Sequence, residues 1–149
     1  MSDSLKARIA DETKATMRAR DSRKLGVLRL IGSEIKRLEV DERRELGDAD
    51  VLAVLERMIK QRVDSERQFR DAQRLDLAEQ EAFEIALIRA FMPVPFTDDE
   101  LAAIVAQAVA DSGATSAREM GAVMSVLRSR VLGRADMKAV SALVKARLG

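Results

Sequence analysis

The chain has 149 residues and a formal net charge of +1, and 47% of its residues are apolar, which suits one medium-sized domain or two small ones. Cysteine and histidine are absent, which excludes disulfide bonds, cysteine nucleophiles, and the commonest general base and metal ligand. Tryptophan and tyrosine are also absent and phenylalanine occurs four times, so an RNA-binding surface built on stacked aromatic side chains is not expected.

Composition also bears on location and on cofactors. No apolar run reaches the roughly 18 residues that a membrane-spanning helix requires. The first residues, MSDSLKARIADETK, mix acidic and basic side chains and lack the apolar core of a secretory signal. We therefore expect a cytoplasmic protein with no membrane contact, no metal and no cofactor.

Four helices are predicted in the first 92 residues. Residues 3–20 form a mostly polar helix, and residues 22–40 carry apolar side chains at i, i+3 and i+4 spacing, the pattern of one buried face. The apolar positions expected to face a core in these two helices are Leu5, Ile9, Met17, Val27, Leu28, Ile31, Ile35 and Leu38.

The segment DERRELGD, residues 41–48, is too polar to bury and is predicted to be a loop, with Asp48 as the N-cap of a long helix over 48–71. Beyond Val63 the apolar side of this helix becomes polar, so its distal half is expected to project or to pack lightly. A fourth helix is predicted near 76–91. The expected inward-facing side chains of these two helices are Val51, Leu52, Leu55, Met58, Ile59, Val63, Leu77, Ile85, Ile88 and Phe91.

The two prolines in Met92-Pro93-Val94-Pro95 interrupt any helix, because each lacks an N–H and restricts the residue before it. We divide the chain there into an N-terminal four-helix domain over 1–92, a linker over 93–97 and a C-terminal three-helix domain over 98–149. No alternating apolar pattern or hairpin signal is present, so the predicted fold class is all-α.

Residue patterns typical of helix termini predict the helices of the C-terminal domain. Two capping-box patterns should begin helices, and two glycines suit the left-handed position that follows a helix. These signals are Thr97 with Glu100, Ser116 with Glu119, Gly113 and Gly133. The last helix is expected to follow Gly133 and to run to Leu148, with Leu143 on its apolar stripe.

Positive charge is concentrated at the C-terminal end of the chain. Residues 120–149 carry six basic side chains against Asp136, a net charge of +5. Residues 1–92 carry 19 basic and 19 acidic side chains and are neutral overall. A basic surface of this kind is typical of proteins that bind anionic partners.

The segment VLGRADMKAV lies inside this basic stretch and is the candidate anion site. Arg128 and Arg130 precede Gly133 in the last predicted turn of one helix. Arg134 and Lys138 follow it one helical turn apart, and they share a face if the next helix starts near Arg134. Helix-start amides and these side chains together suit a phosphate. A structural reason is equally available, because cations favour a helix C-terminus and glycine ends a helix.

The carboxylates Glu79, Glu81 and Glu84 come nearest to a catalytic cluster. We interpret them as solvated charges paired with arginines at i, i+4 spacing. Nothing near them resembles a phosphate-binding loop, a metal-ligand set or a catalytic triad. No catalytic residue is therefore assigned.

Several separate motifs of the chain resemble the GatB/YqeY family. The family's terminal motif is similar to VLGRADMKAVSALVKARL, in which a glycine and a basic residue precede a helix that carries a lysine. Its second helix, long third helix and linker resemble RDSRKLGVLRLIGSEIKRLEVDERREL, VLAVLERMIKQRVDSERQFRDAQRLDLAEQE and IRAFMPVPFTDDELAAIV. Met137 stands where the family often has glycine or proline, and Ser141 where it often has asparagine.

The resemblance implies an all-α protein whose C-terminal domain is similar to the tail of the B subunit of glutamine-dependent tRNA amidotransferase. That enzyme is a carbon–nitrogen ligase, its tail contacts tRNA, and its catalytic portion has no counterpart in these residues, so we expect no catalytic activity of this chain alone. We expect an accessory module that binds tRNA or another RNA through Arg128, Arg130, Gly133, Arg134 and Lys138. A protein of the translation or tRNA-aminoacylation apparatus is the other implied partner, and the alternative is a helical adaptor without a nucleic-acid ligand.

Overall fold

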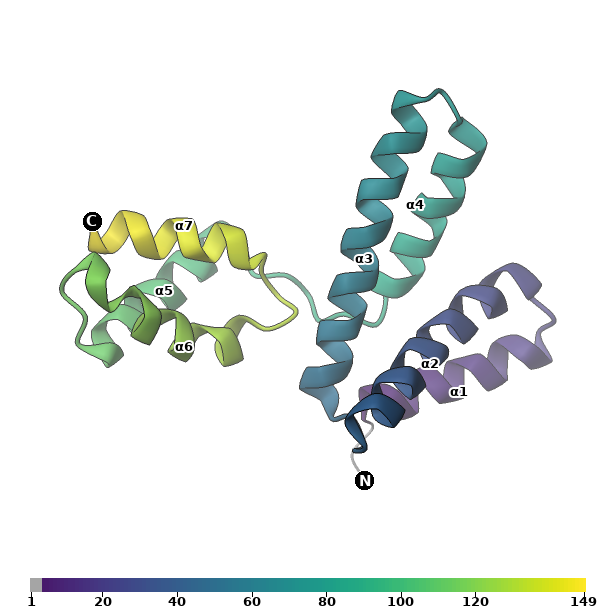
Figure 1. The fold of residues 1–149 in the computed structure, drawn as a ribbon, viewed down its shortest axis with the longest axis horizontal. Helices are drawn as coiled ribbons and strands as arrows, with labels where there is room; N and C mark the ends of the chain where they lie inside the picture. Colours follow the sequence, from purple (N-terminus) through teal and green to yellow (C-terminus); the bar gives the residue numbers. More distant parts are fainter. Residues whose placement is uncertain (1–3) are drawn as a thin grey trace. The chain divides into compact units, whose positions relative to one another are not determined.

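The computed structural model describes residues 4–149, and every regular element in that part of the chain is a helix (Figure 1). The all-α class predicted from the sequence is therefore confirmed. The chain divides between Met92 and Pro93 into two compact units, and each unit has its own apolar core.

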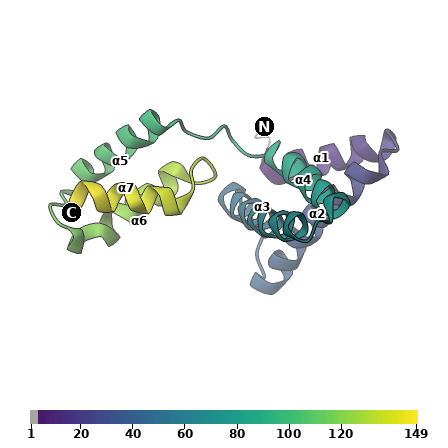
Figure 2. The ribbon, with the colours of Figure 1, turned by 90° about the horizontal axis from the view of Figure 1, so that it is seen from above.

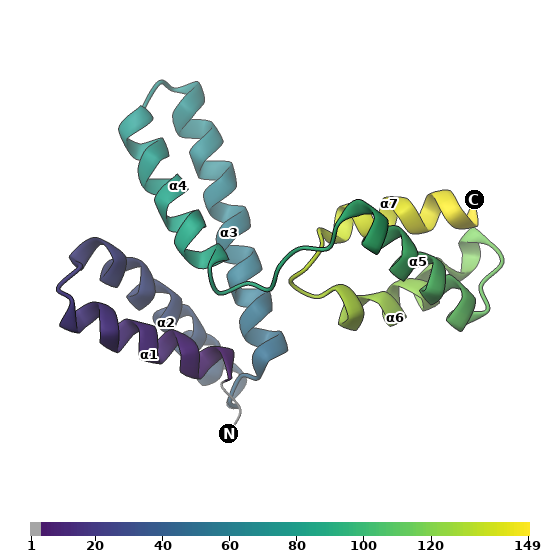
Figure 3. The same cartoon turned by 180° about the vertical axis from the view of Figure 1, so that it is seen from behind.

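The first unit consists of two helical pairs, in which α1 lies beside α2 and α3 lies beside α4 (Figure 1 and Figure 3). The four helices are α1 (Leu5–Arg18), α2 (Ser22–Glu42), α3 (Asp48–Asp71) and α4 (Leu75–Arg89). All four contribute to the core, whose largest fully buried side chains are Leu28, Ile31, Val51, Leu55 and Ile88.

The buried face of α1 differs from the expected stripe by one position. Leu5 and Ile9 are buried as predicted, but Met17 is 51% exposed and Thr16 is buried in its place. At 3.6 residues per turn, Thr16 lies roughly 20° around the helix from Leu5, whereas Met17 lies roughly 120° away. The prediction for Met17 is therefore wrong because its position falls outside the buried sector.

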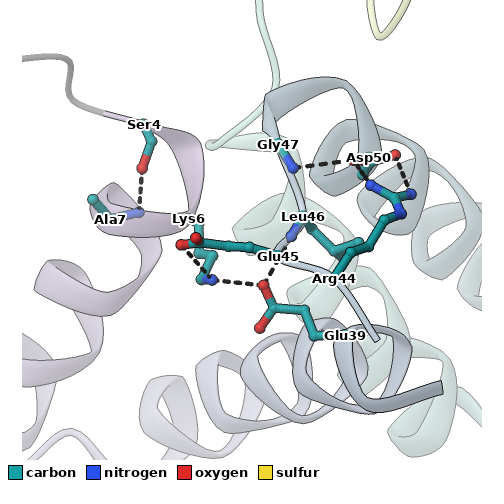
Figure 4. Close-up of polar contacts among 9 residues, drawn as sticks. All are labelled: Ser4, Lys6, Ala7, Glu39, Arg44, Glu45, Leu46, Gly47 and Asp50. Atoms are coloured by element: carbon teal, nitrogen blue, oxygen red, sulfur yellow. Dashed lines mark hydrogen bonds and ion pairs between the residues drawn. The ribbon is translucent and has the colours of Figure 1, made fainter. Parts of the chain in front are cut away.

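The loop between α2 and α3 buries a side chain that the polar pattern did not predict. Helix α2 continues to Glu42, and Leu46 is buried inside the segment expected to be an unburied loop over 41–48. The N–H of Leu46 donates a 2.9 Å hydrogen bond to Oε2 of Glu39, and the same oxygen lies 2.6 Å from Nζ of Lys6 (Figure 4). Leu46 thus anchors the loop on the core, and the ion pair ties it to α1.

Asp50 organises the start of α3. The expected N-cap, Asp48, is instead the first residue of the helix, and its Oδ1 accepts a 2.9 Å hydrogen bond from the N–H of Leu5. Asp50 Oδ2 accepts a 3.0 Å hydrogen bond from the N–H of Gly47, and its carboxylate lies 2.8 and 3.0 Å from the guanidinium nitrogens of Arg44 (Figure 4). Arg44, followed by the Gly47 N–H, lowers the pKa of Asp50 to about 2.

The replacement Asp50→Asn is expected to reduce stability near neutral pH and to have little effect in acid. Because the pKa of Asp50 is lower in the folded chain than in the unfolded chain, its ionised form favours folding. That contribution is fully present above about pH 4 and is lost as the pH falls through about 2. Thermal melting across this range tests the prediction, with Asp11→Asn on α1 as a control for the chemical change. A loss of the same size at every pH would contradict it.

Helix α4 runs beside the distal half of α3, which the sequence did not predict, but no side chain of α3 after Met58 is buried, so this half packs lightly as expected (Figure 1 and Figure 3). The contact between the two helices is polar here. Nε of Arg62 lies 2.9 Å from Oε1 of Glu84, and these side chains are only 15% and 14% exposed. Gln80 donates a 2.9 Å hydrogen bond to the other oxygen of Glu84, while Val63, expected to face the core, is 42% exposed. An ion pair therefore joins the two helices where the apolar stripe of α3 ends.

Two carboxylates of α4 pair with arginines of other helices. Glu79 contacts Arg23 of α2 at 2.7 Å, and Glu84 contacts Arg62 of α3. Glu81 is partly buried, and burial, followed by the charge of Glu84, raises its pKa. Glu79 and Glu84 are paired charges as predicted, but their partners lie on other helices, and Glu84, 14% exposed, is not the solvated charge that was expected.

The second unit contains the remaining helices around a separate core (Figure 1 and Figure 2). They are α5 (Asp98–Ser112), a short 3₁₀-helix η1 (Ala117–Glu119), α6 (Met120–Val131) and α7 (Met137–Leu148). The side chains at the centre of this core are Val105, Ala108, Val123, Leu127, Val131, Val140 and Val144. Leu143, expected on the apolar stripe of the last helix, is 38% exposed.

The first capping box and both glycine signals are confirmed. The hydroxyl of Thr97 accepts a 3.1 Å hydrogen bond from the N–H of Glu100, and the Glu100 carboxylate accepts a 3.0 Å hydrogen bond from the N–H of Thr97. Gly113 has a φ of 71° and Gly133 a φ of 73°, in the left-handed region that favours glycine. These residues end α5 and α6 as the sequence predicted.

The second predicted capping box is wrong. The side chain of Ser116 makes no capping hydrogen bond, and residues 117–119 form the 3₁₀-helix. The Glu119 carboxylate instead accepts hydrogen bonds of 3.4 and 3.3 Å from the N–H and the hydroxyl of Thr115. Helix α6 therefore begins at Met120, three residues after the start that the pattern predicted.

Candidate nucleic-acid interface

The predicted anion site lies at the turn between α6 and α7. Helix α6 ends at Val131, and α7 begins at Met137 with Asp136 as its N-cap. The condition under which Arg134 and Lys138 would share a helix face, a helix start near Arg134, is therefore not met. The turn spans residues 132–136, and it distributes the predicted basic residues over two helices and a loop.

Arg134 is engaged inside its own unit. Its Nε donates a 2.7 Å hydrogen bond to the carbonyl oxygen of Val94, and its guanidinium lies 3.7 Å from the ring centre of Phe96. The carbonyl oxygen of Arg134 accepts a 2.9 Å hydrogen bond from the N–H of Phe96. Arg134 therefore fastens the segment 93–97 to the α6–α7 turn and does not share a helix face with Lys138.

A carboxylate already occupies the start of α7. Oδ1 of Asp136 accepts a 3.1 Å hydrogen bond from the N–H of Lys138. The negative charge of this cap lies where the helix-start amides were expected to receive a phosphate. Any attraction for an anion at this corner must therefore come mainly from side chains.

Arg130 is also paired within the unit. Its guanidinium lies 2.9 Å from Oδ2 of Asp111, so it joins α6 to α5. A hydrogen bond from Gln107, and then the contact with Arg130, lower the pKa of Asp111. Arg130 is thus partly neutralised, although both side chains keep access to solvent.

Arg128 and Lys138 are the two predicted cations that stay unpaired. Both are exposed, and neither side chain makes a hydrogen bond or an ion pair within residues 4–149. Arg128 lies in the last turn of α6 and Lys138 in the first turn of α7, so they flank the turn at 132–136. Their positive charge is free to attract an anion.

The sequence motif missed residues of α7 and of the segment before α5. Lys145 and Arg147 are further exposed cations in the last turn of α7, and the net charge of the segment was their only signal. Phe96, the ring beneath Arg134, lies in the segment expected to be a linker. An aromatic residue directly before a capping box is the available hint that this segment packs.

Two kinds of feature are absent from the described part of the chain. No group of three or more Asp or Glu side chains is placed to hold a metal ion in residues 4–149. Within the same range, no helix combines the length and the apolar character needed to cross a membrane.

Residues 6–148 match the family described as Yqey-like protein. The chain belongs to this family. The resemblance seen in the sequence motifs is therefore confirmed, and it extends over both compact units of this Yqey-like protein.

Two relatives match part of the Yqey-like chain. It is 37% identical over 89 residues to "Uncharacterized protein C22F3.15" of Schizosaccharomyces pombe. This match covers 60% of this chain and 72% of that protein. It is 36% identical over 90 residues to "Altered inheritance of mitochondria protein 41, mitochondrial" of Clavispora lusitaniae, which covers 60% of this chain and 52% of that protein. The chain thus spans about half the length of the second relative.

Proposed function

We propose that this Yqey-like protein is a non-catalytic RNA-binding module that contacts tRNA phosphates with basic side chains of α6 and α7. The observation that carries the proposal is the concentration of positive charge in residues 120–149, a net +5 with Asp136 as the one acidic residue, although the charge of Arg130 is paired with Asp111. That residue caps α7, while Arg128 and Lys138 on either side of the turn keep their charge free.

Phosphate contacts, and not base stacking, provide the affinity in this proposal. The second unit has one aromatic residue, Phe96, and the guanidinium of Arg134 covers its ring. A surface without aromatic platforms binds the nucleic-acid backbone with little sequence preference. The similarity of VLGRADMKAVSALVKARL to the tail of the amidotransferase B subunit supports tRNA as the first RNA to test. A cytoplasmic location is part of the same proposal.

The double variant Arg128→Ala/Lys138→Ala is expected to bind tRNA about tenfold more weakly than the wild type at low salt. Each phosphate contact releases bound counterions. Losing a contact should therefore make the negative slope of log affinity against log salt shallower by roughly 0.7–0.9. Fluorescence anisotropy with labelled tRNA at several salt concentrations measures both quantities.

The matched control is Arg8→Ala/Arg18→Ala, which removes the same charge from exposed positions of α1. Equal weakening by the two double variants would show that only net charge matters and would contradict the assigned surface. Absence of tRNA binding at low salt would exclude the RNA function. A stoichiometric protein copurifying without a nuclease-sensitive component would favour the adaptor alternative.

A further inference from the structure

The outer face of the α1–α2 pair contains a groove of about 600 Å³ that the proposed RNA surface does not involve. Residues from both helices line it, and they fall into a floor and a rim. The lining is Lys6, Ile9, Ala10, Thr13, Lys14, Leu28, Arg29, Gly32, Ser33, Ile35, Lys36 and Glu39. Its volume lies within the range of protein pockets that bind a small molecule or the side chains of a peptide.

The floor of the groove is apolar, and its hydroxyl group already has a hydrogen-bond partner. Ile9, Leu28 and Ile35 are buried side chains of the first core that reach its base. The hydroxyl of Thr13 already donates a 2.7 Å hydrogen bond to the carbonyl oxygen of Ile9. These three side chains are at most 4% exposed, so the apolar surface that an occupant can still cover comes from Ala10, Gly32 and the aliphatic stems of the basic lining residues.

The rim of the groove is positively charged. Four basic residues and one acidic residue line it, and the acidic one, Glu39, is paired with Lys6 at one end (Figure 4). Lys14, Arg29 and Lys36 are exposed and make no hydrogen bond or ion pair to any residue in the range 4–149. The complementary partner carries apolar groups between acidic groups.

Gly32 makes the groove open enough for a close approach. A Cβ at this position would meet no atom within 4 Å, so the fold itself has no steric need for glycine there. Glycine is among the least favourable residues inside a helix. Together with Ala10 and Ser33 it keeps the centre of the groove free of large side chains, which lets another backbone come near.

These features favour a protein helix over the other occupants. A nucleic acid would leave the apolar floor facing phosphates, and the groove has no aromatic residue on which a base could stack. Among the described residues, the helix start with the most acidic side chains is not free to dock as a second copy's contribution. This helix start, at Asp98, Asp99 and Glu100, belongs to α5, whose apolar face is buried in the second core.

We propose that the α1–α2 groove binds an amphipathic helix of a partner protein, with acidic residues on both sides of its apolar stripe. The apolar stripe lies over Ala10, Gly32 and the aliphatic stems of the basic lining residues, and the acidic flanks meet Lys14, Arg29 and Lys36. This helix-in-groove contact is independent of the basic surface of α6 and α7.

A displayed library of helical peptides about 16 residues long tests this specificity on the full chain. Leucine and alanine are fixed at i, i+3, i+4 and i+7 positions, and the flanking positions vary among Glu, Gln and Lys. We expect selection of Glu at the flanks. A selected peptide should bind Gly32→Leu and Arg29→Glu/Lys36→Glu at least tenfold more weakly than the wild type, and its Lys-flanked version should recover binding to the charge-reversed variant.

Gly26→Leu is the matched control, because Gly26 is exposed on the same helix, has equal space for a Cβ and does not line the groove. Its peptide affinity should equal that of the wild type, and Gly32→Leu should melt no lower than the wild type. The charge-reversed variant provides a second readout if Gly32→Leu folds poorly.

Several results would overturn the proposal. One is selection without preference for Glu, and another is equal loss of binding in Gly26→Leu and Gly32→Leu. Loss of tRNA binding in Arg29→Glu/Lys36→Glu would assign the groove to nucleic acid. A dimer, or binding to phosphatidylserine vesicles, that Gly32→Leu abolishes would assign it to a second copy or to a membrane.

Discussion

Replacing Leu127 by alanine is expected to destabilise the second unit by about 3 kcal/mol. Leu127 lies on α6, is fully buried, and belongs to a core shared with Val105 of α5 and Val140 of α7. The change removes three carbons from a packed interior and leaves a cavity that the surrounding helices fill only in part. Because a unit this small has a total stability of only several kcal/mol, we expect much of its population to unfold.

Hydrogen exchange measured segment by segment checks this prediction. Exchange should accelerate in α5, α6 and α7 and stay unchanged in α1 to α4, because the two units have separate cores. Leu143→Ala makes the same chemical change at a 38% exposed position of the same unit, and it should cost less than about 1 kcal/mol. Equal effects of the two variants, or faster exchange throughout the chain, would contradict the prediction.

The helix ends show which parts of this fold the sequence predicts. The box of Thr97 and Glu100 and the turn at Gly113 are local contacts, complete within a few residues, and the structure confirms them. Ser116 and Glu119 have the same spacing, yet Glu119 bonds to Thr115. The pattern identifies the residue types of a local contact, but it does not decide between two neighbouring hydroxyls.

The apolar pattern did not predict contacts between residues that lie far apart in the sequence. Arg62 and Glu84 lie 22 residues apart, and their pairing allows α3 and α4 to pack after the apolar stripe has ended. Leu46 is buried although most of its neighbours in the sequence are charged. In both cases the deciding partner comes from another helix, and periodicity within one segment holds no information about it.

The same limit applies to the candidate RNA surface. The motif predicted four cations around Gly133, and it favoured Arg134 and Lys138 as the pair on one helix face. Arg130 finds its partner Asp111 19 residues away, and Arg134 finds Val94 40 residues away. Those partners divide the predicted set into two cations that hold the unit together and two, Arg128 and Lys138, whose charge is free.

Arg134→Ala is expected to destabilise the second unit by about 1–2 kcal/mol while weakening tRNA binding less than threefold. The variant loses the 2.7 Å hydrogen bond to Val94 and the contact with the Phe96 ring, and with them the attachment of the segment 93–97. Both partners are uncharged, so Arg134 keeps its charge, but its guanidinium is already engaged and acts on RNA through its field and not through a direct phosphate contact. Melting temperature and tRNA affinity, measured on the same samples, separate the two effects.

Arg134→Lys sharpens the test, because lysine keeps the charge but has no Nε donor and no planar group to lie on the ring. We expect this variant to melt nearly as early as Arg134→Ala and to bind tRNA like the wild type. Arg128→Ala should show the reverse pattern, with weaker binding and a stability change within about 0.5 kcal/mol, since its side chain is exposed and unpaired. If Arg134→Ala instead binds tRNA tenfold more weakly at unchanged stability, Arg134 contacts phosphate directly, and the contact with Val94 and Phe96 must open when RNA binds.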